Sequence, residues 1–503
     1  MNKETKGCRY LHQWDLPLPK KWLSICSILF TILLASCHVG PDFVRPPVPD
    51  ITTYTKKKDA PHLIPGNSEP SQHLVKGEAI PAAWWQLFHS PSLDSVVKQA
   101  IANNPTIEAA RAKLAEAQQS ILMTSGAFYP QVDGTLSAQR EKGPPLVFGL
   151  LPPKQIHTYN LYSLGPIVSF VPDVFGLTAR RVEQQKALAE NQAYQLAAAQ
   201  LTVTGNVIAA ALTIASTRLQ IQATEEIIAS DVKNLALVRK RLDVGSVDRT
   251  DLLLAINQLE KDRASLPFLK QQMAAAEDAL AILVGKSPAE WEPPHFELDE
   301  FTLPTDLPLI LPSKLVSQRP DILAAEAELH ASSAAIGVAI GELFPTITLS
   351  ASLNPTALSP GQLFHRSNLA WDVLAGITTP IFHGGTLWAQ KQAAIDAYHA
   401  SIATYRQTVL EGLRQVADML RALGHDAELV QAEHRALDAA KTSLALTRDR
   451  FSVGTANMLQ LLDAERSYQQ ARISYSHACA QRYLDSAQLL VALGGGWNKV
   501  FIK

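Results

Sequence analysis

Two long stretches of the chain, residues 177–243 and 387–452, carry alanine and leucine at helical spacing over a broad face. A helix over either stretch is roughly 100 Å long at 1.5 Å per residue, which far exceeds an ordinary globular domain. Helices with such a broad apolar face pack against neighbours on both sides, and their small residues allow a close approach. The pattern predicts a mainly helical protein whose long helices lie side by side.

Shorter segments alternate apolar and polar residues, and this period of two predicts strands. The four predicted strands cover residues 131–137, about 159–171, 346–352 and about 369–379. Each pair of strands follows a predicted helix, at about residues 92–126 and 312–341, which ends at a glycine followed by a proline. After each long helix, a short turn leads into another helix that ends near Gly285 or Gly494.

This order of elements occurs twice, and matching residues indicate an internal two-fold repeat. Residues 104–110 match residues 319–325 at an offset of 215, and the match continues without a gap for about 25 residues. Further anchors in the same order pair residues 172–176 with 380–384, 241–245 with 450–454, and 283–285 with 492–494. The predicted units are a first repeat (91–290), a proline-rich linker (291–311), a second repeat (312–497) and a tail (498–503).

The first 36 residues are predicted to be an export signal, because Lys20 and Lys21 precede a short apolar run that ends in small residues. The sequence Leu34-Ala35-Ser36-Cys37 resembles a bacterial lipobox, in which the cysteine is acylated and becomes the mature N-terminus. An ordinary signal peptide with a chance cysteine is the alternative. Residues 37–90 are polar and rich in proline, which favours an extended tether over a packed unit.

Composition narrows the possible functions. The formal net charge of -2 gives no indication of nucleic-acid binding. We find no apolar run after the signal that is long enough to span a bilayer as a helix, so any membrane crossing is predicted to use strands. Four strands cannot close a barrel, and lipid does not tolerate an open sheet edge. Three chains would supply twelve strands, a size known for transmembrane barrels.

Neither a catalytic cluster nor a metal-binding cluster is recognisable in the sequence, so we expect no enzymatic activity and no cofactor apart from a covalent lipid on Cys37. If Cys8 and Cys26 are removed with the signal, Cys479 has no partner for a disulfide within the chain.

Several motifs together resemble the TolC/OprM outer-membrane factors, and most of all their NodT-type lipoprotein branch. They are Cys37-x-Val39-Gly40-Pro41-Asp42-Phe43, the repeat, Pro380-Ile381-Phe382-His383-Gly384-Gly385, and Leu493-Gly494-Gly495-Gly496-Trp497. The resemblance covers essentially residues 37–497. It implies a homotrimer with a twelve-stranded barrel in the outer membrane, four strands per chain, and a long α-helical barrel in the periplasm. It also implies docking to a periplasmic adaptor and an inner-membrane transporter.

The resemblance assigns two groups of site residues. The helix turns at the periplasmic end would contact the adaptor, which corresponds here to Val244, Gly245, Ser246, Val453, Gly454 and Thr455. Glycine suits both turns because it adopts the positive φ of a tight reversal. The bland alternative is that they are turns only.

A closed gate in the family uses residues after the second turn, which correspond to Leu459, Gln460 and Asp463, with Asp251 in the first half. Three Asp463 carboxylates near a threefold axis would repel one another, attract cations and hinder anions. The alternative is a surface aspartate paired with Arg466, three residues further on. Ala456 and Phe451 replace an arginine and a tyrosine found in some relatives, which weakens any lock built on those two.

Taken together, these features predict a passive, lipid-anchored exit duct in the outer membrane, with a periplasmic extension, that serves an RND-type tripartite efflux pump for small molecules. A duct for type I protein secretion, a periplasmic adaptor lipoprotein and a lipid-anchored envelope enzyme are the alternatives. The sequence leaves open whether drugs, metals or proteins are transported.

Overall fold

The computed structural model describes residues 39–47, 49–55, 63–64, 71–78, 80–143 and 157–497. The predicted signal, Cys37 and the predicted tail lie outside the described residues. The chain forms two compact units. The first unit is built from Met1–Asp42, Met123–Glu183 and Ala334–Ala394, and the second from Phe43–Leu122, Gln184–Ser333 and Ile395–Lys503.

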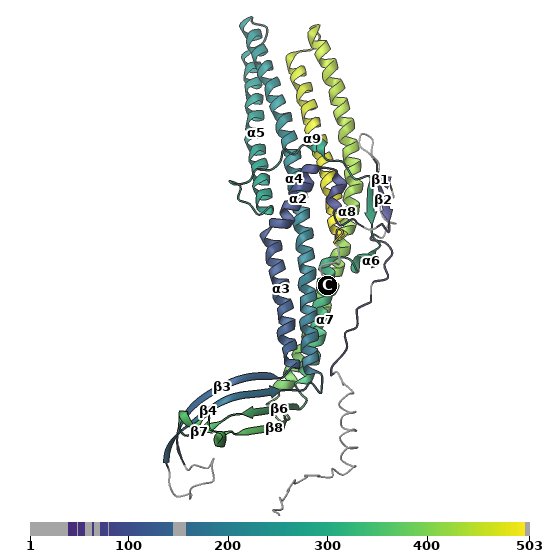
Figure 1. Cartoon of the computed structure of the whole chain (residues 1–503). Coiled ribbons are helices and arrows are strands. Elements are labelled where there is room, and N and C mark those ends of the chain that lie inside the picture. Colours follow the sequence, from purple (N-terminus) through teal and green to yellow (C-terminus); the bar gives the residue numbers. More distant parts are fainter. Residues whose placement is uncertain are drawn as a thin grey trace, which may run out of the picture. The chain divides into compact units, whose positions relative to one another are not determined.

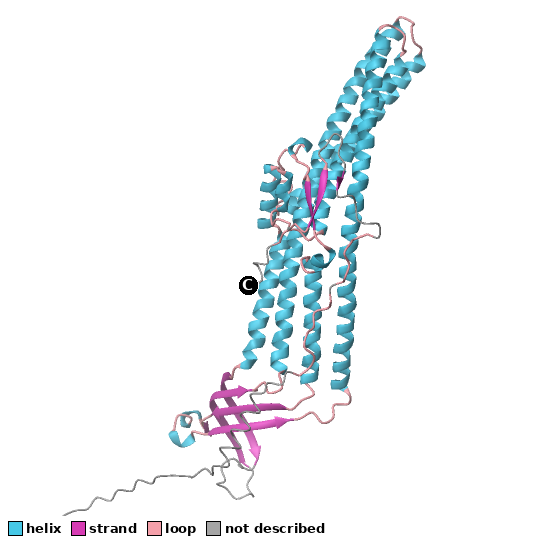
Figure 2. Ribbon diagram, turned by 90° about the vertical axis from the view of Figure 1, so that its right-hand side faces the viewer, coloured by secondary structure: helices cyan, strands magenta, loops and turns pink. Residues whose placement is uncertain are grey.

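The first unit contains an antiparallel sheet in the order β3-β4-β6-β8, drawn as magenta arrows in Figure 2. The strands are β3 (Gln131–Gly143), β4 (His157–Phe170), β6 (Thr346–Leu353) and β8 (Trp371–Thr378), and the two-residue β7 (Thr356–Ala357) adds to β4. All four predicted strands are present, and β3 is longer than expected. Gln131 pairs with Ser169 and Gly143 with His157, so the first hairpin is in register from end to end.

The outer strands of this sheet, β3 and β8, each have a partner on one side only among the described residues. They also carry exposed apolar side chains. Val132 and Leu136 on β3 are 66% and 74% exposed, and Val373 and Ile377 on β8 are 74% and 71% exposed. In the part of the chain that the structure describes, therefore, neither outer edge of the sheet is paired and these apolar side chains are uncovered.

Two long helical hairpins dominate the fold, as labelled in Figure 1. In the first hairpin, α4 (Leu177–Asp243, 67 residues) turns into α5 (Arg249–Leu283, 35 residues). In the second, α8 (Thr386–Ser452, 67 residues) turns into α9 (Met458–Ala492, 35 residues). The bounds predicted from helical periodicity agree with α4 to the residue and with α8 to within one residue.

The expectation that no helix could span a bilayer needs correction. Over an 18-residue window, α4 reaches a mean hydropathy of 1.5 with few charges, so by length and composition it passes as a membrane span. The polar residues within that part of α4 are mostly uncharged Gln, Thr, Asn and Ser, which lower hydropathy only slightly. In the folded chain, 44% of that window is buried against protein.

Each predicted helix before the strands is in fact two helices. Residues 92–126 form α2 (Pro91–Asn103) and α3 (Pro105–Ser125), and residues 312–341 form α6 (Pro312–Val316) and α7 (Pro320–Gly341). Proline disfavours the helical conformation of the residue before it, and Asn104 is accordingly extended, at φ -66° and ψ 124°. The Asn104 side chain accepts a hydrogen bond from the Thr106 amide at the start of α3 and donates one to the Leu283 carbonyl at the end of α5. These two bonds stabilise the break between α2 and α3.

The predicted extended tether and linker are also partly wrong. In the second unit, β2 (Gln72–Lys76) from the tether pairs in parallel with β5 (Asp306–Leu309) from the linker, and β1 (Leu63–Ile64) flanks β2. Leu74 and Leu307 of this small sheet are buried in the main core, together with Trp84 and Phe88 of the 3₁₀ helix Trp84–Phe88. Burial of apolar side chains thus holds part of the tether against the helices.

Candidate functional site at the hairpin tips

The two hairpin turns, at one end of the second unit and at the top of Figure 1, have the same backbone geometry. Gly245 and Gly454 have φ values of 73° and 78°, the left-handed region that glycine adopts without strain. A Cβ added at either glycine would meet nothing within 4 Å, so backbone conformation alone requires glycine here.

Hydrogen bonds close both turns in the same way. The Ser246 amide donates to the Arg241 carbonyl at 2.9 Å, and the Thr455 amide donates to the Arg450 carbonyl at 2.8 Å. In each turn the hydroxyl of the same residue donates a second bond to that carbonyl, at 3.0 Å. This closure satisfies carbonyls that a helix end leaves unpaired. It also leaves Val244 and Val453 exposed at the tips, 78% and 73%, where a partner protein could reach them.

Asp251 and Gln460, two of the predicted gate residues, both serve as capping residues. Asp251 lies at the start of α5, where its carboxylate accepts a bond from the Asp248 amide while the Asp248 side chain accepts from the Asp251 amide. Gln460 and Asn457 exchange the same pair of bonds at the start of α9. These reciprocal bonds are capping boxes, which stabilise helix starts. The sequence interpretation overlooked this role, although the spacing of three residues is a recognised signature.

Below the turns, the two hairpins enclose a cavity of about 530 Å³, which we call the tip cavity. Asp251, Leu459 and Asp463 are among its lining residues, and Gln460 is not. The structure therefore brings three of the four predicted gate residues to one cavity. Among the described residues no ion pair joins Asp463 to Arg466, so one chain does not contain the pair that the alternative interpretation required.

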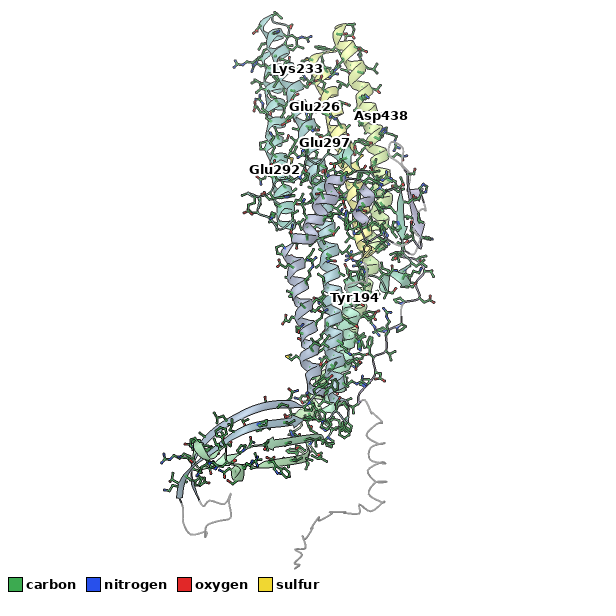
Figure 3. All side chains as sticks on the ribbon, viewed as in Figure 1. Tyr194, Glu226, Lys233, Glu292, Glu297 and Asp438 are labelled. Atoms are coloured by element: carbon green, nitrogen blue, oxygen red, sulfur yellow. The ribbon has the colours of Figure 1, made fainter. Side chains whose placement is uncertain are left out.

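Glu465 of α9 joins the two hairpins across this cavity. Its carboxylate accepts hydrogen bonds from Ser230 and Asn234 of α4, at 3.0 and 2.6 Å. Arg448 of α8 donates to the other oxygen at 3.1 Å. The Glu465 side chain is only 14% exposed, and bonds to a carboxylate are stronger than those between neutral groups. Further from the tip, Arg472 of α9 pairs with Glu226 of α4, which is labelled in Figure 3.

An acid pair lies on the same cavity within the first hairpin. Burial raises the pKa of Asp231 to about 7, and the Asp262 carboxylate adds to the shift because it can accept a hydrogen bond from the protonated Asp231 and because of its charge. The charge of Glu465 raises it further, whereas Arg466 lowers it. Asp262 also accepts a bond from Gln258 at 2.6 Å. Near neutral pH, therefore, the Asp231 carboxyl is protonated in part of the molecules.

An apolar cluster holds the tips together around these polar groups. Leu235 and Val238 of α4, Leu259 of α5, and Met458 and Leu461 of α9 are buried in it. The guanidinium of Arg241 lies over the ring of Phe451, 4.5 Å from the ring centre. This cation–π contact connects the ends of α4 and α8.

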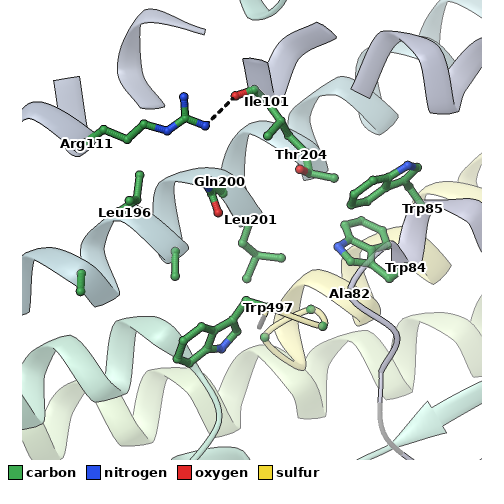
Figure 4. Close-up of a pocket in the computed structure, with 15 residues that line it drawn as sticks. Ala82, Trp84, Trp85, Ile101, Arg111, Leu196, Gln200, Leu201, Thr204 and Trp497 are labelled. Atoms are coloured by element: carbon green, nitrogen blue, oxygen red, sulfur yellow. Dashed lines mark hydrogen bonds between the residues drawn. The ribbon is translucent and has the colours of Figure 1, made fainter. Parts of the chain in front are cut away.

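A second cavity in the same unit, of about 260 Å³, contains none of the predicted site residues. Trp84, Trp85, Leu201 and Trp497 line it, and Arg111 donates a hydrogen bond to the Ile101 carbonyl at its edge (Figure 4). In the described part of the chain, no group of three or more His, Cys, Asp or Glu side chains is placed to hold a metal ion. Cys37, the predicted lipid site, lies outside the described residues.

Comparison with known proteins agrees with this architecture. The family model described as "Outer membrane efflux protein" matches residues 96–286 and 311–495. The cation efflux system protein CusC of Escherichia coli O6:H1 is 28% identical over 489 residues, covering 96% of this chain and all of that protein. Nodulation protein T of Rhizobium leguminosarum bv. trifolii is 25% identical, covering 94% of this chain and 97% of that protein.

Solved structures give the same result. The outer-membrane channel OprN superposes with a TM-score of 0.81 and 27% identity, over 92% of this chain and 100% of that channel. A CusC structure superposes with a TM-score of 0.76 and 25% identity, over 92% of this chain and 100% of that one. The chain therefore belongs to the outer membrane efflux protein family and is an outer-membrane efflux channel component.

Proposed function

We propose that three copies of this chain form a passive exit duct, which carries small molecules across the outer membrane as part of an RND-type tripartite efflux pump. The open-edged sheet β3-β4-β6-β8 is the main support for this proposal. Unpaired backbone groups on β3 and β8 would be costly in lipid. If β3 of one copy pairs with β8 of the next, three copies close a barrel of twelve strands.

The exposed apolar residues of the sheet fit the same arrangement. Val132, Leu136, Val373 and Ile377 lie on the edge strands, where lipid would cover them in a barrel. The helical hairpins then belong in the periplasm. In three copies, the paired α4–α5 and α8–α9 hairpins would supply the walls of a long helical barrel. The equal lengths of the two hairpins support the division into two repeats, residues 91–290 and 312–497, that the sequence suggested.

The hairpin tips are the proposed docking and gating region. Val244, Gly245, Ser246, Val453, Gly454 and Thr455 form exposed turns of equal geometry that an adaptor protein would contact. Asp463 and Leu459 line the tip cavity and are exposed in one chain, so three copies could present them to a common axis. Asp251 and Gln460 would act on the gate indirectly, because their side chains already cap α5 and α9.

The similar proteins do not share one substrate class. The names of relatives refer to cations, to nodulation and to pyoverdine, at 25–29% identity in each case. Cations and pyoverdine are chemically different cargoes, which is consistent with selection by the inner-membrane transporter rather than by the duct. A lipid on Cys37 would anchor the chain, as in the lipoprotein branch that the sequence resembles.

Electron microscopy of the detergent-extracted protein, combined with conductance in planar bilayers, tests the proposal. Threefold averages of a hollow cylinder, with low conductance that rises in Asp463→Ala, are the expected result. A monomer, or a closed particle without conductance in any variant, would overturn it.

A further inference from the structure

The motif Val39-Gly40-Pro41-Asp42, which the proposed duct does not explain, is bound by one buried arginine of the first unit. The Arg180 side chain is only 2% exposed. It donates hydrogen bonds to the carbonyls of Val39 and Gly40, at 2.9 and 3.3 Å, and to the Asp42 carboxylate at 2.7 Å. Glu183, one turn further along α4, accepts a fourth bond at 2.7 Å. Three of these four hydrogen bonds thus go to the backbone and side chain of this motif.

Two glycines bring the motif into backbone contact with α7. A Cβ added to Gly40, whose φ is +89°, would lie 2.4 Å from the Cα of Gly337. A Cβ added to Gly337 would lie 2.9 Å from the Arg180 side chain. Neither position has room for a larger residue, so the motif, α7 and Arg180 fit together only with glycine at both places.

This contact lies where strands give way to helices. The Val39 amide donates to the Phe175 carbonyl at 3.3 Å, and the Phe175 ring stacks on Phe344 with ring centres 5.1 Å apart. Phe175 follows β4 and Phe344 precedes β6. The start of α4 is itself fixed here, because the Asp173 carboxylate accepts bonds from the Thr178 and Ala179 amides.

Directly after the motif, Phe43 stacks on His330 with ring centres 4.4 Å apart and Arg45 pairs with Glu326, but exposed side chains also begin here. Val44, two residues beyond it, is 77% exposed, and Ile51 is 42% exposed. Burial of a charged side chain is costly unless the charge is paired and hydrogen-bonded. The buried Arg180 meets this condition through its bonds to the motif and to Glu183, which a tether that only connected a lipid to the protein would not require. Residues 39–42 are therefore fixed by the buried Arg180 and by backbone contact with Gly337, whereas Val44 and Ile51 beyond them are exposed.

We propose that Arg180, Gly40 and Gly337 form a clamp that holds the lipidated Cys37 beside the membrane end of the strands. Residue 37 is two residues from Val39, which limits its Cα to about 7 Å from that of Val39. The acyl chains then enter the bilayer next to β4 and β6, and Arg180 acts as a positioning residue for the lipid. This inference rests on the proposed acylation of Cys37 and deepens it.

The test compares Arg180→Met in two full-length backgrounds. One is the lipidated chain, and the other is Cys37→Ala behind a leader that an ordinary signal peptidase cleaves. The yield of heat-resistant oligomer in outer-membrane fractions is measured in both. We expect about a tenfold lower yield for Arg180→Met in the lipidated chain, because several charge-assisted bonds are lost, and no further loss in the Cys37→Ala chain.

Matched variants separate positioning from general destabilisation. Arg181→Met, at the neighbouring residue whose partner is Glu342, should leave the yield unchanged in both backgrounds. Gly40→Ala breaks the clamp from the motif side without touching α4, and should reproduce the Arg180→Met pattern. An equal loss for Arg180→Met with and without the lipid, or no loss with it, overturns the clamp. Failure of the parent chain to incorporate labelled palmitate or to form oligomers would instead contradict the proposed function.

Discussion

The two helical hairpins share a backbone plan but differ in the charges that they carry. Each pairs a helix of 67 residues with one of 35, and each turns through a glycine with positive φ. The turns lie 209 residues apart, from Gly245 to Gly454. The cap of the first hairpin consists of two aspartates, Asp248 and Asp251, whereas the second has the neutral pair Asn457 and Gln460.

The acid pairs differ in the same way. At the offset of the turns, Asp231 and Asp262 correspond to Ala440 and Ala471, so only the first hairpin has an acid pair near its tip. The second hairpin has its pair, Asp426 and Asp485, about twice as many residues from its turn. Burial first, and then Asp485, raises the pKa of Asp426 to about 7, and the buried Arg482 opposes the shift. The two turns thus share one backbone geometry, while only the first hairpin has an acid pair with a raised pKa close to its turn.

Glu465→Ala should have the largest effect on the stability of the tips, because it removes the carboxylate of the second hairpin that accepts hydrogen bonds from the first. It leaves Ser230 and Asn234 without their acceptor, and we expect a loss of about 2–3 kcal/mol in local stability. Hydrogen exchange of the tip amides measures the loss. Glu260→Ala, at a surface glutamate paired with Arg263, is the control and should be neutral within experimental error. Equal protection in both variants would contradict the role given to Glu465.

Gly245→Ala and Gly454→Ala should each cost about 1 kcal/mol, since both glycines have positive φ with free space around them. Equal costs would confirm that the two turns are equivalent. Gly424→Ala provides the control, because Gly424 lies within α8 with free space and no positive φ, and alanine there should stabilise the helix. Denaturant unfolding followed by a label at each tip measures the differences. A turn variant as stable as the parent chain would argue against the strained-backbone account.

Asp231→Asn should remove a pH dependence that arises from the acid pair of the first hairpin. The pKa of Asp231 is raised from 3.8 to about 7 in the folded tip, so the folded tip binds the proton more tightly than an open one. The stability of the tip should therefore be highest in acid, fall as the pH rises from about 4 to about 7, and level off above that. The thermal midpoint reported by a label at Val244 tests this. A label at Val453 serves as the internal reference, and parallel pH profiles at the two labels would count against the prediction.

The smallest expected effect concerns the caps. Hydrogen bonds from the Asp251 and Thr250 amides lower the pKa of Asp248, so its stabilising effect is present above the ordinary aspartate pKa and is lost as the pH falls through the lowered value. Asn457, the neutral counterpart, should show no such loss. Asp248→Asn should therefore remove the part of this acid-dependent loss that Asp248 contributes, as followed by amide chemical shifts. The effect is small because Asp248 is exposed to solvent.

The periodicity of the sequence was sufficient to predict the hairpins and the four strands, but contacts between distant segments were not predictable. The strand β2 was missed because its partner β5 lies more than 200 residues away, and Gln72 donates its side-chain bond to the Pro304 carbonyl across that distance. The break at Asn104 was missed because apolar periodicity continues across it, while proline also fits the first turn of a helix.

At the hairpin tips, too, local features could be predicted from the sequence and contacts between distant segments could not. Glycine at the turns could be predicted, because tight helix reversals need positive φ. The capping boxes at Asp248 and Asn457 could have been found from their spacing. The meeting of Asp231, Asp262 and Glu465 could not, because they come from three helices whose rotation about their axes decides which side chains face the cavity. The contact of Arg180 with Val39 joins residues 141 positions apart, and no local sequence pattern predicts it.

The unpaired edges of β3 and β8 also bear on how quickly the protein can mature. A strand whose backbone groups find partners only on another copy cannot finish folding alone, so in the proposed trimer its folding would become a reaction between molecules. The rate of maturation would then rise steeply with the amount of chain delivered to the membrane. At low expression, half-formed sheets would persist for longer and remain exposed to envelope proteases, which makes the abundance of the channel depend on supply in a non-linear way.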